Sequence, residues 1–362
     1  MQLLYKPDWE QTKEHFEAWW KREDLGRCAL AVTAPQDGSR GIRPPEFPKK
    51  VEDRWLDFDW LHEINEYRMK TTFYGGEAFP VWNAGYPGWE CIQTFLGCPI
   101  DLGEETGWIH PIIADGELTD HDYRKFVIKP DNRWWSFLQA VERFAVEDSK
   151  DKAIPGLQDL GSSGDTLAAM RGTENLLMDL LDCPDYVREF DLYLTRLWFE
   201  VYETVYQITR TGAEGSTSWI NFWSPGKYYN IQNDLSYMIS PKTFIDVFLP
   251  SIELQVQYLD HIVYHVDGVN AFVHVDALCD IPGLQALQIL PGDGKPSPLY
   301  YMDVLKKVQA KGKNLFISLP PHEVETALEM LSSRGLFIST VCDTREEAEY
   351  LLRMAEKWSR FI

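Results

Sequence analysis

The C-terminal third of the chain repeats one unit, a strand-like apolar run followed by a helical pattern. The runs begin near Ile262, Gln285, Asn314 and Leu336, so that successive starts lie 23, 29 and 22 residues apart. Such an interval holds one strand, one helix and two short loops, which is the spacing of a β/α repeat. The repeat predicts an α/β fold of the (β/α)8 TIM barrel type, with an open doubly wound sheet as the alternative.

The rest of the chain is compatible with a single domain. Barrels of this kind reach 362 residues, so residues 1–362 are expected to form one barrel. Residues 9–24 space large aromatic side chains at helical intervals, which predicts an N-terminal helical extension. Residues 72–125 mix polar and aromatic residues without one clear period, and we expect an irregular insertion there, near the barrel mouth.

Composition and charge limit the possible partners. Hydrophobic residues make up 44% and charged residues 25% of the chain, as in soluble globular proteins. The net charge of -21 would repel nucleic acid and anionic membranes. The six cysteines form no CxxC pair, no stretch of about 18 residues is continuously apolar, and the first residues lack a signal-peptide pattern. We therefore expect a cytoplasmic protein without a disulfide framework.

Residue types that bind metals stand where strands are expected to end. The run that begins at Ile262 ends in His265 and Asp267, and the last strand-like run ends in Cys342. The carboxyl ends of parallel barrel strands meet at one mouth, so these side chains could form a zinc site with one position open to substrate. The alternative is that His265 and Asp267 only form hydrogen bonds, and that Cys342 packs against the last helix.

Other strand ends supply candidate pocket residues. Asp234 is the best candidate for a catalytic role beside His265, and capping of a helix or turn is its alternative role. Aromatic rings at a barrel mouth could hold a cationic methylated amine or stack on an aromatic ether. The candidate substrate-binding residues are Trp108, Asp159, Trp219, Asn221 and Trp223.

Several segments resemble the uroporphyrinogen decarboxylase superfamily, whose fold is a (β/α)8 barrel. The likeness covers roughly residues 150–362 and is faint before that. The segments are GSSGDTLAAMRGTENLLMDLLDCPDYV, NDLSYMISPKTFIDVFLPSI, the HVDG strand end, IPGLQALQILPGDG and FISTVCDTREEAEYLL.

Within that superfamily the chain most resembles the cobalamin-dependent methyltransferases, which bind zinc through His-x-Cys after one strand and a cysteine after the last. This chain matches them at His265 and Cys342 and differs at Asp267. The resemblance implies a corrinoid-dependent methyltransferase, in which zinc assists methyl transfer between a small methylated donor or thiol acceptor and a corrinoid. The chain has no Asp-x-His-x-x-Gly motif, so the cobalamin would be carried by a separate corrinoid protein.

Two other functions stay open. A decarboxylase without metal belongs to the same superfamily, but this chain lacks the Arg-Gln-Ala-Gly-Arg-Tyr motif of the decarboxylases and their histidine near the position of Cys342. The other alternative is a non-catalytic barrel that only binds a corrinoid protein. Metal content distinguishes the methyltransferase from the decarboxylase, and turnover distinguishes it from the non-catalytic barrel.

Overall fold

The chain folds around a seven-stranded sheet that is parallel except at one edge. The computed structural model describes residues 2–83 and 91–361. The strand order in the sheet is β2-β1-β11-β10-β9-β8-β7, and only β2 runs antiparallel to its neighbour. The strands of this sheet are β1 (Ala29–Pro35), β2 (Thr72–Gly76), β7 (Tyr228–Gln232), β8 (His261–Asp267), β9 (Ala286–Leu290), β10 (Asn314–Ser318) and β11 (Leu336–Val341).

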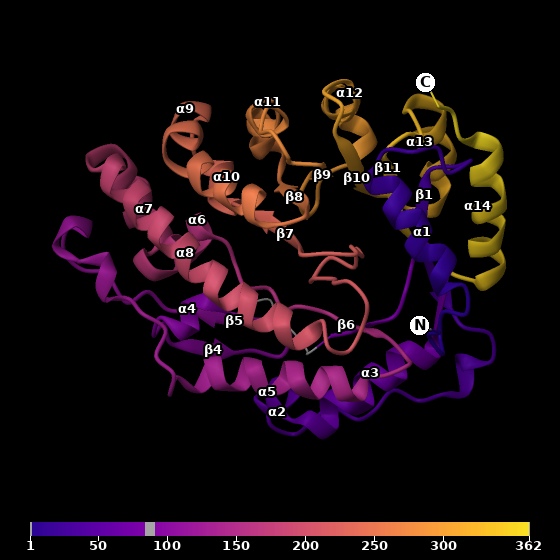
Figure 1. The fold of residues 1–362 in the computed structure, drawn as a ribbon, viewed down its shortest axis with the longest axis horizontal. Helices are drawn as coiled ribbons and strands as arrows, with labels where there is room; N and C mark the ends of the chain where they lie inside the picture. Colours follow the sequence, from indigo (N-terminus) through magenta and orange to yellow (C-terminus); the bar gives the residue numbers. More distant parts are fainter. Residues whose placement is uncertain (1, 84–90, 362) are drawn as a thin grey trace.

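The predicted β/α repeat is confirmed in the C-terminal third. Strands β8 to β11 begin within one residue of the predicted positions, and each is followed by a helix. Figure 1 shows these helices along the outer side of strands β7 to β11. They are α10 (Leu249–Tyr258), α11 (Val275–Cys279), α12 (Met302–Ala310), α13 (Val324–Met330) and α14 (Arg345–Trp358).

Two further strands form a separate parallel pair. In the sequence they lie between β2 and β7, the two edge strands of the large sheet. The pair consists of β3 (Val81–Trp82) and β6 (Ile154–Pro155). One backbone hydrogen bond joins the segment after β6 to the segment before β7, from Leu157 N to Thr217 O (3.0 Å), while the bond from Glu77 N to Leu30 O (3.1 Å) continues the β1–β2 ladder. In the described part of the chain no strand pairing joins this pair to the seven-stranded sheet. The arrangement is therefore barrel-like, without a continuous ring of paired strands in the described part of the chain.

The remaining helices lie between residues 9 and 243. Figure 1 shows α3, α5 and α8 across the part of the molecule opposite α11 and α12. The helices are α1 (Trp9–Trp20), α2 (Asp53–Leu56), α3 (Phe58–Thr71), α4 (Ile92–Phe95), α5 (Arg133–Asp148), α6 (Ser163–Arg171), α7 (Thr173–Asp182), α8 (Pro184–Thr209) and α9 (Pro241–Thr243). No helix of the described residues is both long and apolar enough to cross a bilayer.

Residues 72–125 are more regular than the sequence indicates. They contain β2 and β3, the short helix α4 and an antiparallel hairpin of β4 (Ile100–Leu102) and β5 (Gly107–Ile109). The expected irregular insertion is thereby corrected in part, because this stretch supplies one strand of the large sheet and one of the small pair. Residues 84–90 lie outside the described part of the chain.

The helix α1 fills the space inside the sheet, next to the amino ends of the strands. Its Phe16 ring stacks on Phe337 of β11 at 5.8 Å, and its Trp19 ring lies 4.7 Å from Phe222. Both belong to a buried inner cluster that also contains Val263 and Phe316. The aromatic spacing of the first helix is therefore explained by its burial beneath the sheet, where large rings exclude water from the interior.

The strands alternate between this inner cluster and an outer core under the helices. On β8, Val263 belongs to the inner cluster, while Ile262 and Tyr264 belong to the outer core. On β11, Phe337 belongs to the inner cluster and Ile338 to the outer core. Since successive side chains of a strand point to opposite faces, this alternation decides which residues near the strand ends can reach an internal site.

Candidate active site

Three side chains that can bind a metal meet at the carboxyl ends of β7 and β8. His265 and Asp267 lie on β8, two residues apart, and share the inner face with Val263. Asp234 opens the short helix Asp234–Met238, which follows β7. One potential ligand atom from each of Asp234, His265 and Asp267 lies within 4.8 Å of the other two. The fold thus places two carboxylates and one imidazole within reach of a single cation.

His265 is held by residues on both sides. Its ring is 9% exposed and lies edge-on to the Trp219 ring at 5.3 Å. Its Nδ1 is 2.6 Å from Oε1 of Gln288, the residue opposite it on β9. An amide oxygen can only accept, so Nδ1 carries the proton and Nε2 keeps its lone pair. Burial lowers the pKa of His265, and the neutral imidazole is the form that binds metals.

Both carboxylates lie in an environment that is unfavourable for a negative charge. Asp234 retains solvent contact at a recess, yet desolvation there raises its pKa, and the nearby Asp267 and Asp159 raise it further. Oδ1 of Asp267 is buried and has no hydrogen-bond partner among the described residues. Like charges and an unsatisfied buried oxygen are unfavourable without a cation. A donor set of one imidazole and two carboxylates fits a divalent ion such as zinc or manganese.

A fourth acidic residue, Asp165 on α6, positions Asp234. Its two carboxylate oxygens accept the backbone N–H groups of Asp234 and Leu235, each at 3.0 Å. Burial raises the pKa of Asp165, and the neighbouring Asp234 raises it as well. The start of α6 approaches closely, because a Cβ at Gly164 would lie 2.5 Å from the side chain of Asn233. Asp165 therefore fixes the helix that carries Asp234, and the GSSGD turn allows the close approach.

Gly268, which completes the HVDG strand end, has a similar steric role. Its φ is +87°, and a Cβ there would lie 2.5 Å from the ring of Tyr237. Tyr237 belongs to the same short helix as Asp234. A glycine after Asp267 therefore lets this helix pack against the end of β8.

The structure places Cys342 directly after β11, in the outer core and not in the interior. Ser339 and Val341 line the interior, while Cys342 belongs to the outer core beneath the helices. Burial raises the pKa of the Cys342 thiol to about 11, with further contributions from Glu347 and Asp343. In the described part of the chain it joins no group of potential metal ligands. The site thus brings together His265 and Asp267 as predicted, with Asp234 in place of Cys342.

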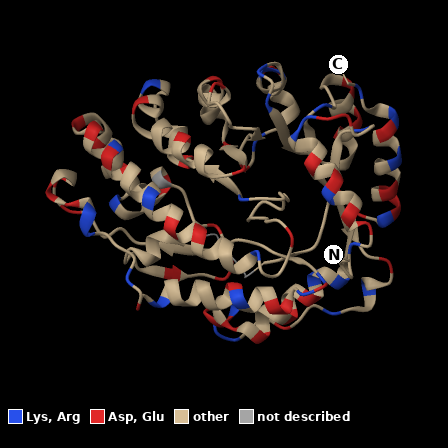
Figure 2. Ribbon diagram, in the orientation of Figure 1, with Lys and Arg blue, Asp and Glu red and all other residues tan. Residues whose placement is uncertain are grey.

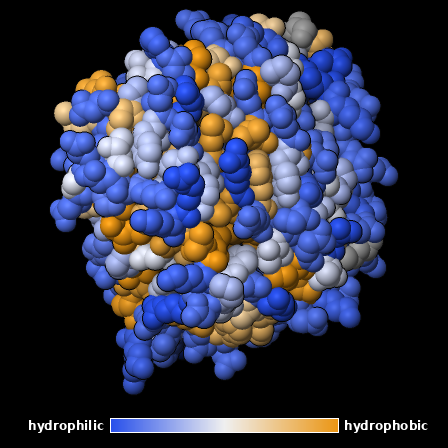
Figure 3. Space-filling model, turned by 60° about the vertical axis from the view of Figure 1, so that its left-hand side comes forward, coloured by the Kyte–Doolittle hydropathy of each residue, from blue (hydrophilic) through white to orange (hydrophobic). Residues whose placement is uncertain are grey.

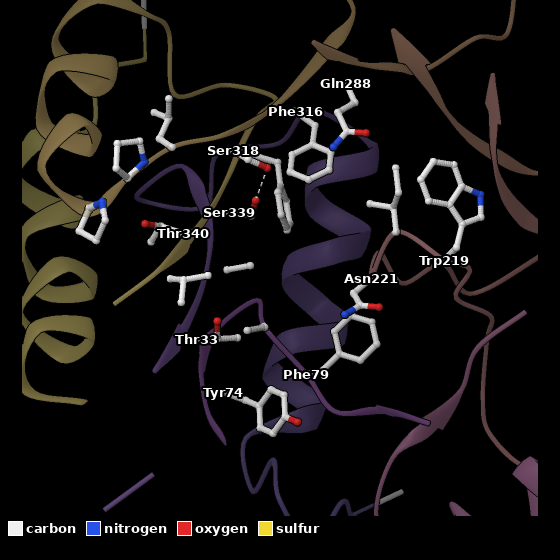
Figure 4. Close-up of a pocket in the computed structure, with 18 residues that line it drawn as sticks. Thr33, Tyr74, Phe79, Trp219, Asn221, Gln288, Phe316, Ser318, Ser339 and Thr340 are labelled. Carbon is white, nitrogen blue, oxygen red and sulfur yellow. Dashed lines mark hydrogen bonds between the residues drawn. The ribbon is translucent and has the colours of Figure 1, made fainter. Parts of the chain in front are cut away.

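A cavity of about 690 Å³ lies next to residues that contact His265, although none of Asp234, His265 and Asp267 lines it. Gln288 and Trp219, which hold His265, form one side of it, and Ser318, Ser339 and Thr340 lie on the other side (Figure 4). The other lining residues are Ala31, Thr33, Tyr74, Ala78, Phe79, Ile220, Asn221, Phe316, Leu319, Pro320, Pro321, Phe337 and Val341. The cavity therefore lies along the carboxyl ends of β1, β9, β10 and β11.

Two of the predicted substrate-binding residues line this cavity, namely Trp219 and Asn221. Trp223 is buried in the inner cluster against Trp9 and donates its Nε1–H to Glu214 O at 2.9 Å, so it does not reach the cavity. Trp108 lies on β5 and is 67% exposed, away from the lining residues.

Asp159 lies behind Asp234 rather than in the cavity. Its Oδ1 accepts hydrogen bonds from the backbone N–H of Gly161 (2.8 Å) and from the hydroxyl of Tyr229 (3.2 Å). The residue is buried, and its charge acts on Asp234. Asp159 is thus part of the support of the site.

Sequence reasoning missed Gln288, Ser318 and Asp165. Gln288 and Ser318 lie on β9 and β10, inside apolar runs that indicate strands. A polar residue inside such an apolar run is the signal that could have found them. Gln288 is buried, and a buried amide needs a partner, while Ser318 is exposed at the end of its strand. Asp165 follows the Gly-Ser turn, where a carboxylate is ordinarily a helix cap.

Comparisons with known proteins support the fold. No protein-family model and no curated protein sequence matches the chain. Among solved structures, a methyltransferase from Methanosarcina mazei is similar over 96% of this chain and 98% of its own, with a TM-score of 0.64 and 12% identity. A variant methylaspartate ammonia lyase from Clostridium tetanomorphum covers 63% of this chain and 51% of its own, with 10% identity and a TM-score of 0.29, too low to inform the argument. The chain therefore shares its fold, from end to end, with a methyltransferase.

Proposed function

We propose that this chain is a methyltransferase that uses a divalent metal, most simply zinc, held by Asp234, His265 and Asp267. The observation that carries the proposal is the position of these three side chains, at strand ends and beside a cavity, in a fold shared with a methyltransferase. We further propose that the barrel-like fold is the (β/α)8 barrel of the uroporphyrinogen decarboxylase superfamily. The methyl group would pass between a small methylated compound or a thiol and the cobalt of a separate corrinoid protein.

Different residues would bind the metal, orient its ligands and bind the substrate. When bound, the metal would act as a Lewis acid toward the heteroatom that carries the methyl group. Gln288 and Trp219 hold the His265 ring in one orientation, and Asp165 holds the helix of Asp234. The cavity next to them would orient the substrate and exclude water from the reacting carbon.

The charge of the cavity argues against the decarboxylase alternative. A substrate with several carboxylates needs basic side chains, above all arginine, to bind it. No Lys, Arg or His occurs among the described residues that line the 690 Å³ cavity. The proposal of a decarboxylase that acts on a polycarboxylate is therefore the weaker one.

The direct test is methyl transfer in the presence of a reduced corrinoid protein. Wild-type protein should convert the corrinoid to its methylcobalt form with a methylated donor, followed by absorbance. Asp267→Asn should lower the rate by about 100-fold or more, because loss of one ligand or its partner weakens metal binding and activity. Asp276→Asn is the matched control, since Asp276 is an exposed residue paired with Lys307 at 2.6 Å. No methylcobalt from any methylated donor, together with no demethylation in the reverse direction, would contradict the proposal.

A further inference from the structure

We propose that the 690 Å³ cavity binds an uncharged molecule with an aromatic ring and an oxygen substituent. We also propose that this ligand is an aryl methyl ether that donates the methyl group. That donor role rests on the proposed methyl transfer. The ligand class itself follows from the lining of the cavity.

The first argument is charge. The described residues that line the cavity include no Asp, Glu, Lys, Arg or His. The titratable side chain among them is Tyr74, and burial raises its pKa to about 12, so it is neutral at physiological pH. Figure 2 shows most charged residues on the outer helices. The cavity has no charged side chain to compensate the desolvation of a sulfonate, and it offers a quaternary ammonium only the faces of its aromatic rings. It therefore favours a neutral ligand.

The second argument is the apolar surface of the cavity. Phe79, Phe316, Phe337 and Trp219 contribute their rings to it (Figure 4). Phe316 and Phe337 meet edge to face, with ring centroids 5.2 Å apart. Such rings provide faces and edges against which a flat aromatic ligand packs better than a globular one. The volume is within the range of cavities that hold one small organic ligand.

The third argument is an incomplete set of hydroxyl hydrogen bonds. Oγ of Ser318 and Oγ of Ser339 lie 2.7 Å apart, on residues that face each other across β10 and β11. One hydrogen bond between two hydroxyls uses one hydrogen, so the second hydrogen is free to donate. Ser318 is exposed, Ser339 is partly exposed, and both line the cavity, so the two serine hydroxyls form a hydroxyl wall. This wall is suited to bind an oxygen of a ligand.

The geometry gives the ligand a direction. The hydroxyl wall lies across the cavity from Trp219 and Gln288, which contact His265 (Figure 4). A ring that places one oxygen at Ser318 and Ser339 can extend its opposite substituent toward the metal-ligand group. In the methyl transfer, the O–CH3 bond of that substituent breaks and the methyl carbon bonds to the reduced cobalt of the corrinoid protein. The aryl oxygen keeps the bonding electron pair and takes a proton from water.

The test compares ligands of similar size that differ in charge. Binding to the purified chain is measured by calorimetry, without corrinoid protein, for 1,4-dimethoxybenzene, phenyltrimethylammonium and methoxybenzenesulfonate. We expect the neutral ether to bind at least tenfold more tightly than either ion. Tighter binding of an ion, or no binding of the ether, would overturn the ligand class.

A variant pair tests the hydroxyl wall. Ser318→Ala combined with Ser339→Ala should weaken binding of the ether by about tenfold, because its oxygen loses its donors. Ser136→Ala, on the exposed side of α5, is the matched control and should bind as the wild type does. Equal binding by the double variant and the wild type would remove the serines from the site. Binding of the ether without any methyl transfer would contradict the proposed function alone, so the two failures are distinguishable.

Discussion

The side chain of Gln288 accepts a hydrogen bond from Nδ1 of His265 over 2.6 Å, across neighbouring strands, and also lines the 690 Å³ cavity. One residue thus connects the metal-ligand group with the space where a substrate would lie. The bond sets which ring nitrogen faces the two carboxylates, and it restricts rotation of the imidazole. The orientation of His265 is therefore determined by a residue that cannot itself act as a base.

Replacement of Gln288 should weaken metal binding. Gln288→Leu removes the acceptor for Nδ1 and leaves the His265 ring free to change its orientation, so we expect about 10- to 100-fold weaker metal affinity. A metal titration with a competing chelator measures the change. Gln207→Leu, at an exposed position of α8, is the control. Unchanged affinity in Gln288→Leu would show that the hydrogen bond does not orient the ligand.

Asp165 should affect both stability and metal binding. Asp165→Ala leaves the backbone N–H groups of Asp234 and Leu235 without their acceptor, and loss of such a cap costs about 1–2 kcal/mol. The free energy of unfolding is measured in urea, and metal affinity in the same preparation. Asp165→Asn should lose less, because its amide oxygen can still accept one of the bonds. Full metal affinity in Asp165→Ala would contradict a positioning role.

A buried ion pair should make stability fall in acid. Glu77 is fully buried and accepts two hydrogen bonds of 2.7 Å from Arg27. Burial raises the pKa of Glu77, but Arg27 and His15 outweigh this effect and lower the pKa to about 2. The folded pKa lies below the usual value of 4.5, so this stabilisation is present above pH 4.5 and is lost as the pH falls toward 2. Glu77→Gln should cost about 3–5 kcal/mol at pH 7, since it leaves Arg27 unpaired. Urea unfolding of both proteins between pH 3 and pH 7 measures it, and parallel pH profiles would contradict it.

Glu142 should have the opposite dependence on pH. It is buried on α5, and burial raises its pKa from 4.5 to about 8 while Gln158 lowers it less. The folded chain then holds a proton that the unfolded chain releases, so stability falls as the pH rises from 4.5 to 8, by at most about 1.4 kcal/mol per pH unit. Glu142→Gln should remove this decrease, which unfolding in urea at pH 5.5 and pH 8 measures. Glu147→Gln, at an exposed position of the same helix, should keep it.

The strands of the C-terminal third could be predicted because each apolar run and the helix after it carry their own periodicity. His265 and Asp267 were found for the same reason, since residues two apart on one strand must share a face. Asp234 was found through a segment that resembles a known superfamily. These predictions needed only local pattern and the rule that parallel strands end at one edge.

The face of Cys342 could not be predicted. The run FISTVC is apolar at Phe337 and at Ile338, because Phe337 packs in the inner cluster and Ile338 packs in the outer core. A strand buried on both faces has no alternation of polar and apolar residues, so the sequence does not show which residues point inward. The position of Trp223 could not be predicted either, because an aromatic side chain can pack in the inner core or line a cavity. Figure 3 shows that apolar side chains also remain on the outer surface, so hydrophobicity alone does not indicate burial.

The metal content of ligand variants tests the central claim most directly. Protein purified without a histidine tag is measured by elemental analysis as wild type, His265→Ala, Asp234→Asn and Cys342→Ala. We expect about one divalent ion per chain in the wild type, less than a tenth of that in His265→Ala, and a clear loss in Asp234→Asn. Cys342→Ala should keep the wild-type content, because its thiol lies in the outer core. Metal that is lost in Cys342→Ala and kept in His265→Ala and Asp234→Asn would contradict the site described above.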